Sequence, residues 1–530
     1  MKVFKTPFQK TGFFSDLITD YLDKAKSLQP YYGNFPDLTG FRKQIDEKNK
    51  SFSSTAREVL IAALNEQYAD VIVSEQTLGN LESLAAENTF TITTGHQLNL
   101  FTGPLYFLYK IISTINLCEE LKRNFPAFNF VPIYWMASED HDFEEIKFFN
   151  FKGVKFQWNS QQTGGVGRFN TEGLSEVLSV FEKYIGTSKN AEFLHQLFEK
   201  AYVKHTNLAA ATRYIANELF GAYGLVVIDG DDVNLKRQFV PYVLKELDDQ
   251  TSYKQVSSTI NALEKSYKIQ VNPREINLFY LTESFRERII VENGVYKVKN
   301  KDISWNKEEL MAHVRLFPER FSPNVIMRPL YQEVILPNLC YIGGGGELAY
   351  WFELQAYFKE VSIPFPILLL RNSVQILSQK QLHKAQKLHI SLEELFLKQN
   401  DLVKKKIKEL SKITVDFTEQ KKVLHSQFNT LREVATKTDV SFLGAVNAQE
   451  VKQNKGLINL EKRLLKAEKR KHKDVVARIV ALQNDVLPNQ GLEERQRNFS
   501  EYYLEYGPNF IDALKESLHP LDSQFITLVL

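Results

Sequence analysis

Three short polar clusters hold the side chains in this sequence that could do chemistry. In the first, Gly95-His96-Gln97-Leu98-Asn99, the histidine could give a proton or a hydrogen bond to an anion. In the second, Ser138-Glu139-Asp140-His141-Asp142-Phe143-Glu144-Glu145, closely spaced carboxylates could bind a cation, hold an amine or accept its proton. In the third, Gly343-Gly344-Gly345-Gly346-Glu347, glycines would let backbone amides approach a ligand.

Each cluster also has a structural interpretation. The first could be a plain turn in which His96 caps or packs. In the second, Ser138 is a good helix N-cap, and acidic residues are common in a first helical turn. The third could be a tight packing turn, because it lacks the Lys-Ser/Thr of a P-loop and does not fit GxGxxG.

Within the second cluster, the order of the residues separates the candidates. Asp140 and His141 are the preferred reactive groups, because they come earliest after the preceding apolar run. Glu144 and Glu145 are expected to face solvent or to pair with Lys147.

The elements around these clusters predict a parallel sheet. Residues 54–87 have a helical pattern, and the β-branched run 89–94 predicts a strand that ends at Gly95. A long helix then begins at Pro104, and the apolar run 129–136 predicts a second strand. Strand, helix and strand make a βαβ unit with a right-handed crossover.

Later segments extend this core. Residues 225–229 predict a further strand of the same sheet, and the runs 334–337 and 367–371 flank the glycine run and close the core. Asn293-Gly294 within residues 288–298 is a strong signal for a β-hairpin. In open parallel sheets, ligands bind beyond the carboxyl ends of the strands, where the three clusters fall.

The last part of the chain predicts an antiparallel coiled coil. Phe417, Leu424 and Leu431 stand seven apart, and Leu457, Leu460, Leu464 and Ala467 repeat the pattern on a second helix. The two helices are joined near residues 437–442. A basic stretch over residues 462–478 could bind RNA, but acidic residues dilute it and a solvated helix face is the favoured interpretation.

Composition excludes several classes of protein. The chain has 530 residues, 43% of them hydrophobic and 25% charged, which indicates more than one globular unit. A net charge of +2 argues against a globally basic nucleic-acid binder. The two cysteines, Cys118 and Cys340, offer no CxxC zinc pair, and no metal site is expected. Without a signal peptide or a membrane-length apolar run, the cytoplasm is the expected location.

Several of these motifs together resemble the BshC family, the cysteine ligases that complete bacillithiol synthesis. The matching residues are Thr94-Gly95-His96-Gln97, Thr102-Gly103-Pro104-Leu105-Tyr106 with Lys110, the string from Ser138 to Glu145, Leu336-Pro337, Tyr341-Ile342-Gly343-Gly344 with Glu347 and Tyr350-Trp351, and Glu494-Arg495 before Tyr506-Gly507. The string Ser138 to Glu145 is the most specific of them, and the resemblance covers nearly the whole chain.

The resemblance implies an α/β fold. A Rossmann-type parallel-sheet core like that of class I aminoacyl-tRNA synthetases would carry connective insertions and a C-terminal coiled-coil arm that forms a homodimer. The predicted divisions are core 1–155, insertion 156–210, core strand region 211–235, second insertion 236–328, closing core 329–375, coiled-coil arm 376–487 and a tail packed on the core, 488–530.

The resemblance also implies the reaction. Cysteine would be joined through its carboxyl group to the amino group of glucosaminyl-malate, with no nucleic-acid or membrane partner. Asp140 or His141 would take the proton from the amine, and His96 would stabilise an oxyanion or phosphate. The other expected substrate- or nucleotide-binding residues are Gly95, Gln97, Asn99, Ser138, Asp142, Gly343, Gly344 and Glu347, with Arg371 for the malate carboxylates.

Two departures from synthetases keep alternatives open. No KMSKS-like lysine loop lies near Arg371-Asn372-Ser373, so ATP is a candidate cosubstrate on grounds of fold alone. No Cys/His cluster could hold the zinc that some cysteine-activating enzymes use. The alternatives are a nucleotidyltransferase that adenylates another acceptor and a non-catalytic dimeric scaffold with a degenerate synthetase-like core.

Overall fold

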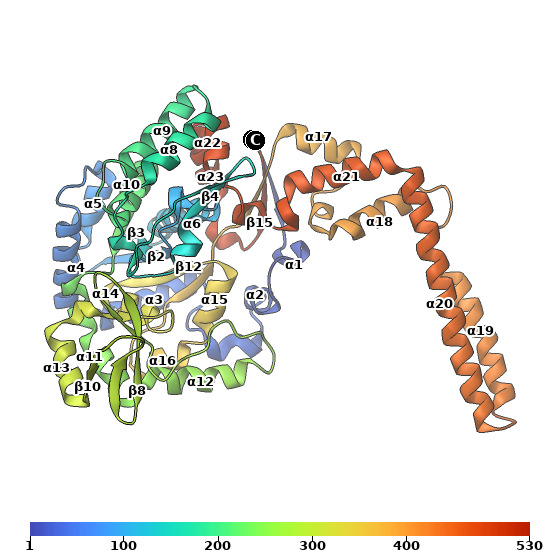
Figure 1. Cartoon of the computed structure of the whole chain (residues 1–530), viewed down its shortest axis with the longest axis horizontal. Helices are drawn as coiled ribbons and strands as arrows, with labels where there is room; N and C mark the ends of the chain where they lie inside the picture. Colours follow the sequence, from blue (N-terminus) through green and yellow to red (C-terminus); the bar gives the residue numbers. More distant parts are fainter.

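A parallel sheet forms the centre of the protein in the computed structural model, which describes residues 1–439 and 441–530 in full and residue 440 in its backbone (Figure 1). Its five strands, in order across the sheet, are β13 (Ile367–Leu370), β12 (Asn338–Gly343), β2 (Thr89–His96), β3 (Asn129–Met136) and β6 (Val226–Asp229). All four neighbouring pairs run parallel, so every strand ends at the same edge.

Helices cover both faces of this sheet, which explains why its strands read as continuous apolar runs. On one face, Phe90 and Ile92 pack with Leu117 of α6 (Tyr106–Asn124). On the other face, the ring of Trp135 lies 5.5 Å from that of Tyr331 in α14 (Arg328–Ile335). Further helices on the core are α3 (Leu38–Ser51), α4 (Ser54–Gln67), α5 (Glu75–Ser83), α15 (Gly345–Phe352) and α16 (Gln355–Glu360).

The predicted core elements are confirmed, with changes at their ends. The strand predicted over 89–94 continues through Gly95 to His96, and the helix predicted from Pro104 begins at Tyr106. The helical pattern over 54–87 is two helices, α4 and α5, separated by an irregular stretch. The run 334–337 is the end of α14 and its exit, and the strand of this region follows it as β12.

Two insertions flank the strand β6. The first contains the hairpin of β4 (Phe148–Phe151) and β5 (Val154–Gln157), followed by α8 (Leu174–Ile185), α9 (Lys189–Tyr202) and α10 (Leu208–Phe220). The second contains α11 (Val233–Asp249), α12 (Thr251–Leu263), α13 (Lys307–Leu316) and an antiparallel sheet of β11 (Phe321–Pro323), β7 (Leu278–Leu281), β8 (Arg286–Glu292), β9 (Val295–Val298) and β10 (Ser304–Trp305). The predicted hairpin is confirmed as β8 and β9, with Asn293 and Gly294 at φ of 52° and 79°.

The C-terminal part leaves the core and returns to it. After β14 (Val374–Leu377) come α17 (Gln379–Lys387), α18 (Gln399–Leu410), α19 (Thr418–Ala435), α20 (Val440–Lys471) and α21 (Lys473–Val486), and α19 and α20 project as an arm (Figure 1). The tail then forms α22 (Ser500–Tyr506), α23 (Asn509–Ser517) and β15 (Phe525–Val529). Strand β15 lies between β14 and the N-terminal β1 (Lys2–Thr6), so the two chain ends share one sheet.

The arm is the predicted antiparallel helix pair, but part of its predicted seam is wrong. Phe428, Ala435 and Val446 are buried between the two helices. Leu431 and Leu460, expected in the seam, are 43% and 52% exposed. One pair of helices buries a single apolar stripe on each, so these leucines stay on an outer face. No helix in the described part of the chain is apolar enough over a sufficient length to cross a bilayer.

Candidate active site

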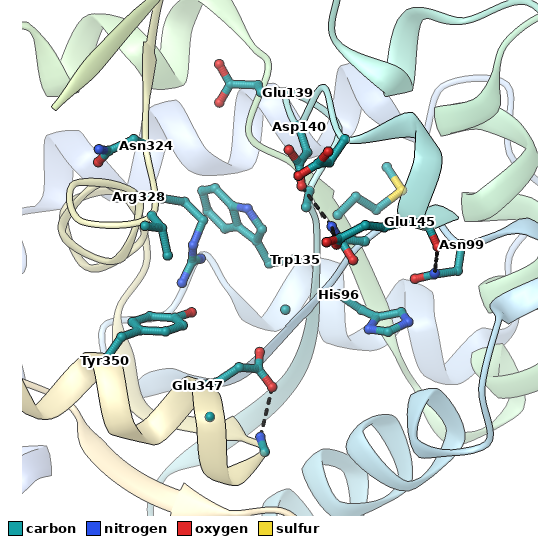
Figure 2. A pocket seen from close by; sticks show the side chains of 18 of the residues that line it. His96, Asn99, Trp135, Glu139, Asp140, Glu145, Asn324, Arg328, Glu347 and Tyr350 are labelled. Atoms are coloured by element: carbon teal, nitrogen blue, oxygen red, sulfur yellow. Dashed lines mark hydrogen bonds between the residues drawn. The ribbon is translucent and has the colours of Figure 1, made fainter. Parts of the chain in front are cut away.

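A cavity of about 1060 Å³ lies at the carboxyl edge of the central sheet and brings the three polar clusters together. Figure 2 shows its two sides: His96, Asn99, Asp140 and Glu145 lie on one, and Arg328 and Tyr350 on the other. Every predicted site residue lines this cavity except Gly343. Gly343 is wrong as a lining residue because it is the last residue of β12, where its carbonyl accepts the backbone N–H of Arg371.

His96 is held at the end of β2 between aromatic rings from the first turn of α6. Its ring centroid lies 5.3 Å from that of Tyr106 and 5.1 Å from that of Phe107. Burial, together with the nearby charge of Lys110, holds the pKa of His96 well below its usual value of 6.5. The imidazole is therefore neutral at physiological pH and can donate one N–H, but it supplies no positive charge.

An amide bridge connects the first two clusters. The side-chain Nε2 of Gln97 donates to Asp140 Oδ2 over 3.0 Å and to Glu145 Oε2 over 3.1 Å. Asp140 Oδ1 also accepts the backbone N–H of His141 over 2.8 Å, which fixes the orientation of the carboxylate. A carboxylate has about four lone-pair sites, so Asp140 keeps capacity to accept a ligand N–H.

Glu145 faces solvent at the cavity rim, which was one of the two expected placements, and it does not pair with Lys147. Its carboxylate also bonds Gln97, so it takes part in the site. Lys147 pairs instead with Glu144 over 2.6 Å, as predicted for that glutamate. The short helix α7 (Phe143–Ile146) turns Glu144 away from the site and Glu145 toward it.

His141 is poorly suited to take a proton. Nη1 of Arg286 donates to its Nδ1 over 2.9 Å, so the ring hydrogen belongs on Nε2 and neither nitrogen has a free lone pair. Burial and the same guanidinium lower the pKa of His141. Of the two candidate bases, the geometry favours Asp140.

Ser138 is not the N-cap of a helix. Its hydroxyl bonds the carboxylate of Asp229 at the end of β6, and α7 begins later, after Asp142. Asp142 is exposed and lines the cavity without a capping bond. Neighbouring Glu139 is buried against Lys236 at 2.6 Å, and burial raises its pKa in spite of that cation.

The glycine run and α6 meet at the cavity floor through an ion pair. Lys110, 3% exposed, lies 2.6 Å from Glu347 Oε2 and donates to the carbonyl of Gly95 over 2.7 Å. Glu347 also accepts the hydroxyl of Tyr341 and the backbone N–H of Gly344, both over 2.8 Å. Although burial opposes it, Lys110 keeps the pKa of Glu347 below 4.5. Glu347 is thus a paired carboxylate that ties three core segments together.

Arg371 lines the cavity but is largely committed elsewhere. Its Nη1 and Nη2 donate to Glu494 of the C-terminal tail over 3.1 and 2.7 Å, and both side chains are buried. Only Nε is left without an acceptor among the described residues. This placement makes Arg371 a poor partner for two malate carboxylates.

Five arginines that line the cavity were not among the predicted site residues: Arg274, Arg286, Arg288, Arg328 and Arg495. Three of them lie in the second insertion, which is thus a wall of the site as well as a connection. Arg286 and Arg288 stand two apart on β8, so both face the same side of the sheet. That period-two spacing in a predicted hairpin was the one available signal.

A buried carboxylate supports the loop that carries Arg274. Glu353, 1% exposed, accepts the backbone N–H groups of Gln270 and Val271 over 2.8 and 3.4 Å. Burial raises its pKa from 4.5 to about 7, with the two N–H donors opposing this shift. Gln270 and Val271 line the cavity, so the charge of Glu353 affects a wall of the site.

The pH dependence of stability tests this support. Because the pKa of Glu353 is higher in the folded than in the unfolded chain, the native state loses stability as pH rises from about 4.5 through about 7. We expect Glu353→Gln to remove this loss, so that the Tm of the variant gains on the wild type over that interval. The control is Glu360→Gln, an exposed glutamate paired with Lys245. Parallel Tm curves for wild type and Glu353→Gln would contradict the expectation.

Comparison with known proteins gives full-length matches. The family model described as bacillithiol biosynthesis BshC, N-terminal Rossmann-like domain, matches residues 1–372, and that of the BshC C-terminal coiled-coil domain matches residues 374–530. A Flavobacterium johnsoniae protein named "Putative cysteine ligase BshC" is 56% identical, covering 98% of this chain and 98% of its own. Relatives of the same name come from Christiangramia forsetii (56%; 98% and 97% covered) and Bacillus cytotoxicus (27%; 94% and 95% covered).

These matches confirm the predicted Rossmann-like core and coiled-coil domain. A solved structure from Campylobacter jejuni, whose title names an arginyl t-RNA synthetase, covers 84% of this chain and 98% of its own at 11% identity. Its TM-score of 0.23 is too low to carry an argument about the fold.

Proposed function

This chain belongs to the bacillithiol biosynthesis BshC family, and from that premise we propose that it joins cysteine to glucosaminyl-malate through an amide bond. The prediction of a ligase is confirmed at the level of the family, whose members are named cysteine ligases. The observation that supports this particular pair of substrates is the charge distribution of the cavity. Carboxylates of the second polar cluster line the cavity together with arginines of the second insertion, and Arg286 joins the two groups through its bond to His141.

The arginines of the second insertion suit the malate part of the acceptor. Arg274 and Arg288 line the cavity, and neither has an ion-pair partner among the described side chains. Arg286 also has no carboxylate partner among the described side chains, and three of its five N–H groups donate to His141, Ser322 and the carbonyl of Pro323. A dicarboxylate would neutralise this region, and guanidinium groups bind carboxylates with paired hydrogen bonds.

The carboxylates of the second polar cluster suit the amino group of the sugar. An amine attacks a carbonyl carbon only when neutral, so a base must take its proton. Asp140, fixed by Gln97 and by the His141 backbone, is the base that we assign. As the C–N bond forms, the amine proton passes to Asp140, and a carboxyl oxygen of cysteine leaves with the group that activated it.

A group at the end of β2 would stabilise the charge that develops on the carbonyl oxygen. Nε2 of His96 is buried without a partner among the described residues. In the tautomer that carries its single hydrogen on Nε2, the neutral imidazole would donate a hydrogen bond to an oxyanion. ATP remains a candidate for the activating cosubstrate.

Reconstitution from pure components tests the function. Enzyme, cysteine and glucosaminyl-malate are incubated with each nucleoside triphosphate in turn, and the thiol product is identified by mass spectrometry. We expect the amide product with at least one nucleotide. ATP–pyrophosphate exchange that needs no glucosaminyl-malate and yields no amide would favour a nucleotidyltransferase. No turnover with any nucleotide, together with loss of the product in a deletion strain, would favour a scaffold.

The arm supports a homodimer. Outside its buried seam, the arm has four apolar side chains that are at least half exposed: Val423 (57%), Val434 (50%), Val451 (54%) and Leu460 (52%). A second copy of the arm could bury these residues in a wider helical bundle. Sedimentation of the intact enzyme tests this association.

A further inference from the structure

The floor of the cavity has hydrogen-bond donors that the proposed contacts to malate and amine do not use. Nη2 of Arg328 and Nε of Arg371 are both buried, and neither has an acceptor among the described residues. Both arginines line the cavity, and Arg371 is 3% exposed. A buried donor without a partner costs folding free energy, which a bound acceptor would recover.

Arg328 differs from the other two cations of the floor in having no carboxylate partner. Lys110 is balanced by Glu347, and Arg371 by Glu494. Arg328 has no carboxylate partner among the described side chains, and its Nη1 donates to the neutral amide of Gln332 over 3.0 Å. Arg328 therefore adds an unbalanced positive charge to the floor, beside that of the exposed Arg495.

Aromatic rings fix the position of this guanidinium. The Cζ of Arg328 lies 5.6 Å from the ring centroid of Trp135 and 5.6 Å from that of Tyr341. Figure 2 shows its guanidinium between Trp135 and Tyr350, on the side of the cavity where Glu347 also lies. A charge held in this way is already placed for a ligand, which lowers the entropic cost of binding.

The N-terminus of α15 faces the same place. A methyl group on Gly344 would lie 3.7 Å from Arg371 Nε, so the glycine run and this donor are adjacent. The first N–H groups of a helix have no intrahelical acceptor. Glu347 satisfies that of Gly344, while Gly345 and Gly346 follow it at the cavity wall. The helix dipole adds to the positive potential there.

We propose that Arg328 Nη2, Arg371 Nε and the N-terminus of α15 form an oxyanion subsite, separate from the malate-binding arginines, for the donor half of the reaction. The inference rests on the proposed function and deepens it. The ligand is either the carboxylate of cysteine or a phosphoryl group of the activating cosubstrate. The subsite thereby takes the place of the lysine loop that the chain lacks near Arg371.

Calorimetric titration of the full-length enzyme tests this subsite with three probes. L-Cysteine presents a carboxylate, cysteamine is the same amino thiol without it, and inorganic pyrophosphate presents phosphoryl oxygens. The variant is Arg328→Gln, which keeps a polar side chain and leaves no carboxylate unpaired. The control is Arg315→Gln, which removes the same charge from an exposed position on α13.

We expect Arg328→Gln, but not Arg315→Gln, to weaken the binding of an oxyanion probe at least tenfold. Weakened cysteine binding with unchanged cysteamine binding identifies the carboxylate, and weakened pyrophosphate binding identifies the phosphoryl group. Arg328→Lys should recover part of the affinity, because it restores the charge without the planar fork.

Unchanged affinity of Arg328→Gln for both oxyanions would overturn the subsite, as would a wild type that binds neither. If the wild type forms the amide product but Arg328→Gln binds the oxyanion probes as tightly as the wild type, the subsite alone is refuted. If Arg328→Gln loses this binding but the wild type forms no amide product in any mixture, the proposed reaction alone is refuted.

Discussion

Replacing Asp140 with asparagine is expected to lower kcat by about 10²- to 10⁴-fold, the usual effect of losing a general base. Asparagine keeps one of the two carboxylate oxygens, which can still accept from the His141 backbone, while the bond from Gln97 to the other oxygen is lost. The KM for each substrate should change little, since the lost step is proton transfer. Single-turnover formation of the amide product measures this effect separately from product release.

The same acidic string provides the control. Glu144→Gln removes an equal charge four residues away, from a side chain that is 78% exposed and pairs with Lys147. It should leave kcat near that of the wild type. If Asp140→Asn had the same kcat as Glu144→Gln, the assignment of the base would be wrong.

Replacing Arg288 with glutamine is expected to raise the KM for glucosaminyl-malate about 100-fold, because a charge-assisted hydrogen bond to a carboxylate is lost. The KM for cysteine should stay unchanged, since that substrate occupies the opposite side in the proposed arrangement. Steady-state kinetics with each substrate varied in turn measures both values.

Lys299→Gln is the matched control for Arg288. Lys299 is exposed at the end of the same hairpin, and its backbone N–H donates to the Arg288 carbonyl, but its side chain does not line the cavity. An equal rise in the KM for glucosaminyl-malate in both variants would indicate a general electrostatic effect and no malate contact at Arg288.

The sequence predicted the core well because burial on both faces leaves a strong local signal. β3 was predicted with its observed bounds from its apolar run, and the hairpin was predicted from Asn293-Gly294. The arm register was predicted less well, since Leu431 and Phe428 are equally apolar in sequence and only the packing of α20 decides which is buried.

The site could be predicted only in part, for a physical reason. Residues that follow the strands of a parallel sheet meet at one edge, which placed His96 and Asp140 together. Arg274 and Arg328 reach the cavity from segments far along the chain, through long-range packing that no local pattern encodes. Similarly, nothing in the sequence around Arg371 indicates that Glu494 of the tail occupies its guanidinium.

The first cluster begins inside a strand and not at a turn, as its sequence had suggested. Gly95 and His96 are strand residues, and nine residues separate His96 from α6, so the histidine packs beside this helix and is not its N-cap. We propose that the neutral His96 acts there as a hydrogen-bond donor. Unbalanced positive charge at the floor comes from Arg328, since Lys110 is paired with Glu347.

A crystal structure of the enzyme with bound glucosaminyl-malate would show directly how the acceptor lies in the cavity. We expect its malate carboxylates against Arg274 and Arg288 and its sugar nitrogen within hydrogen-bond distance of Asp140. A ligand bound in the reverse orientation, with its nitrogen among the arginines, or bound outside this cavity, would contradict this expectation.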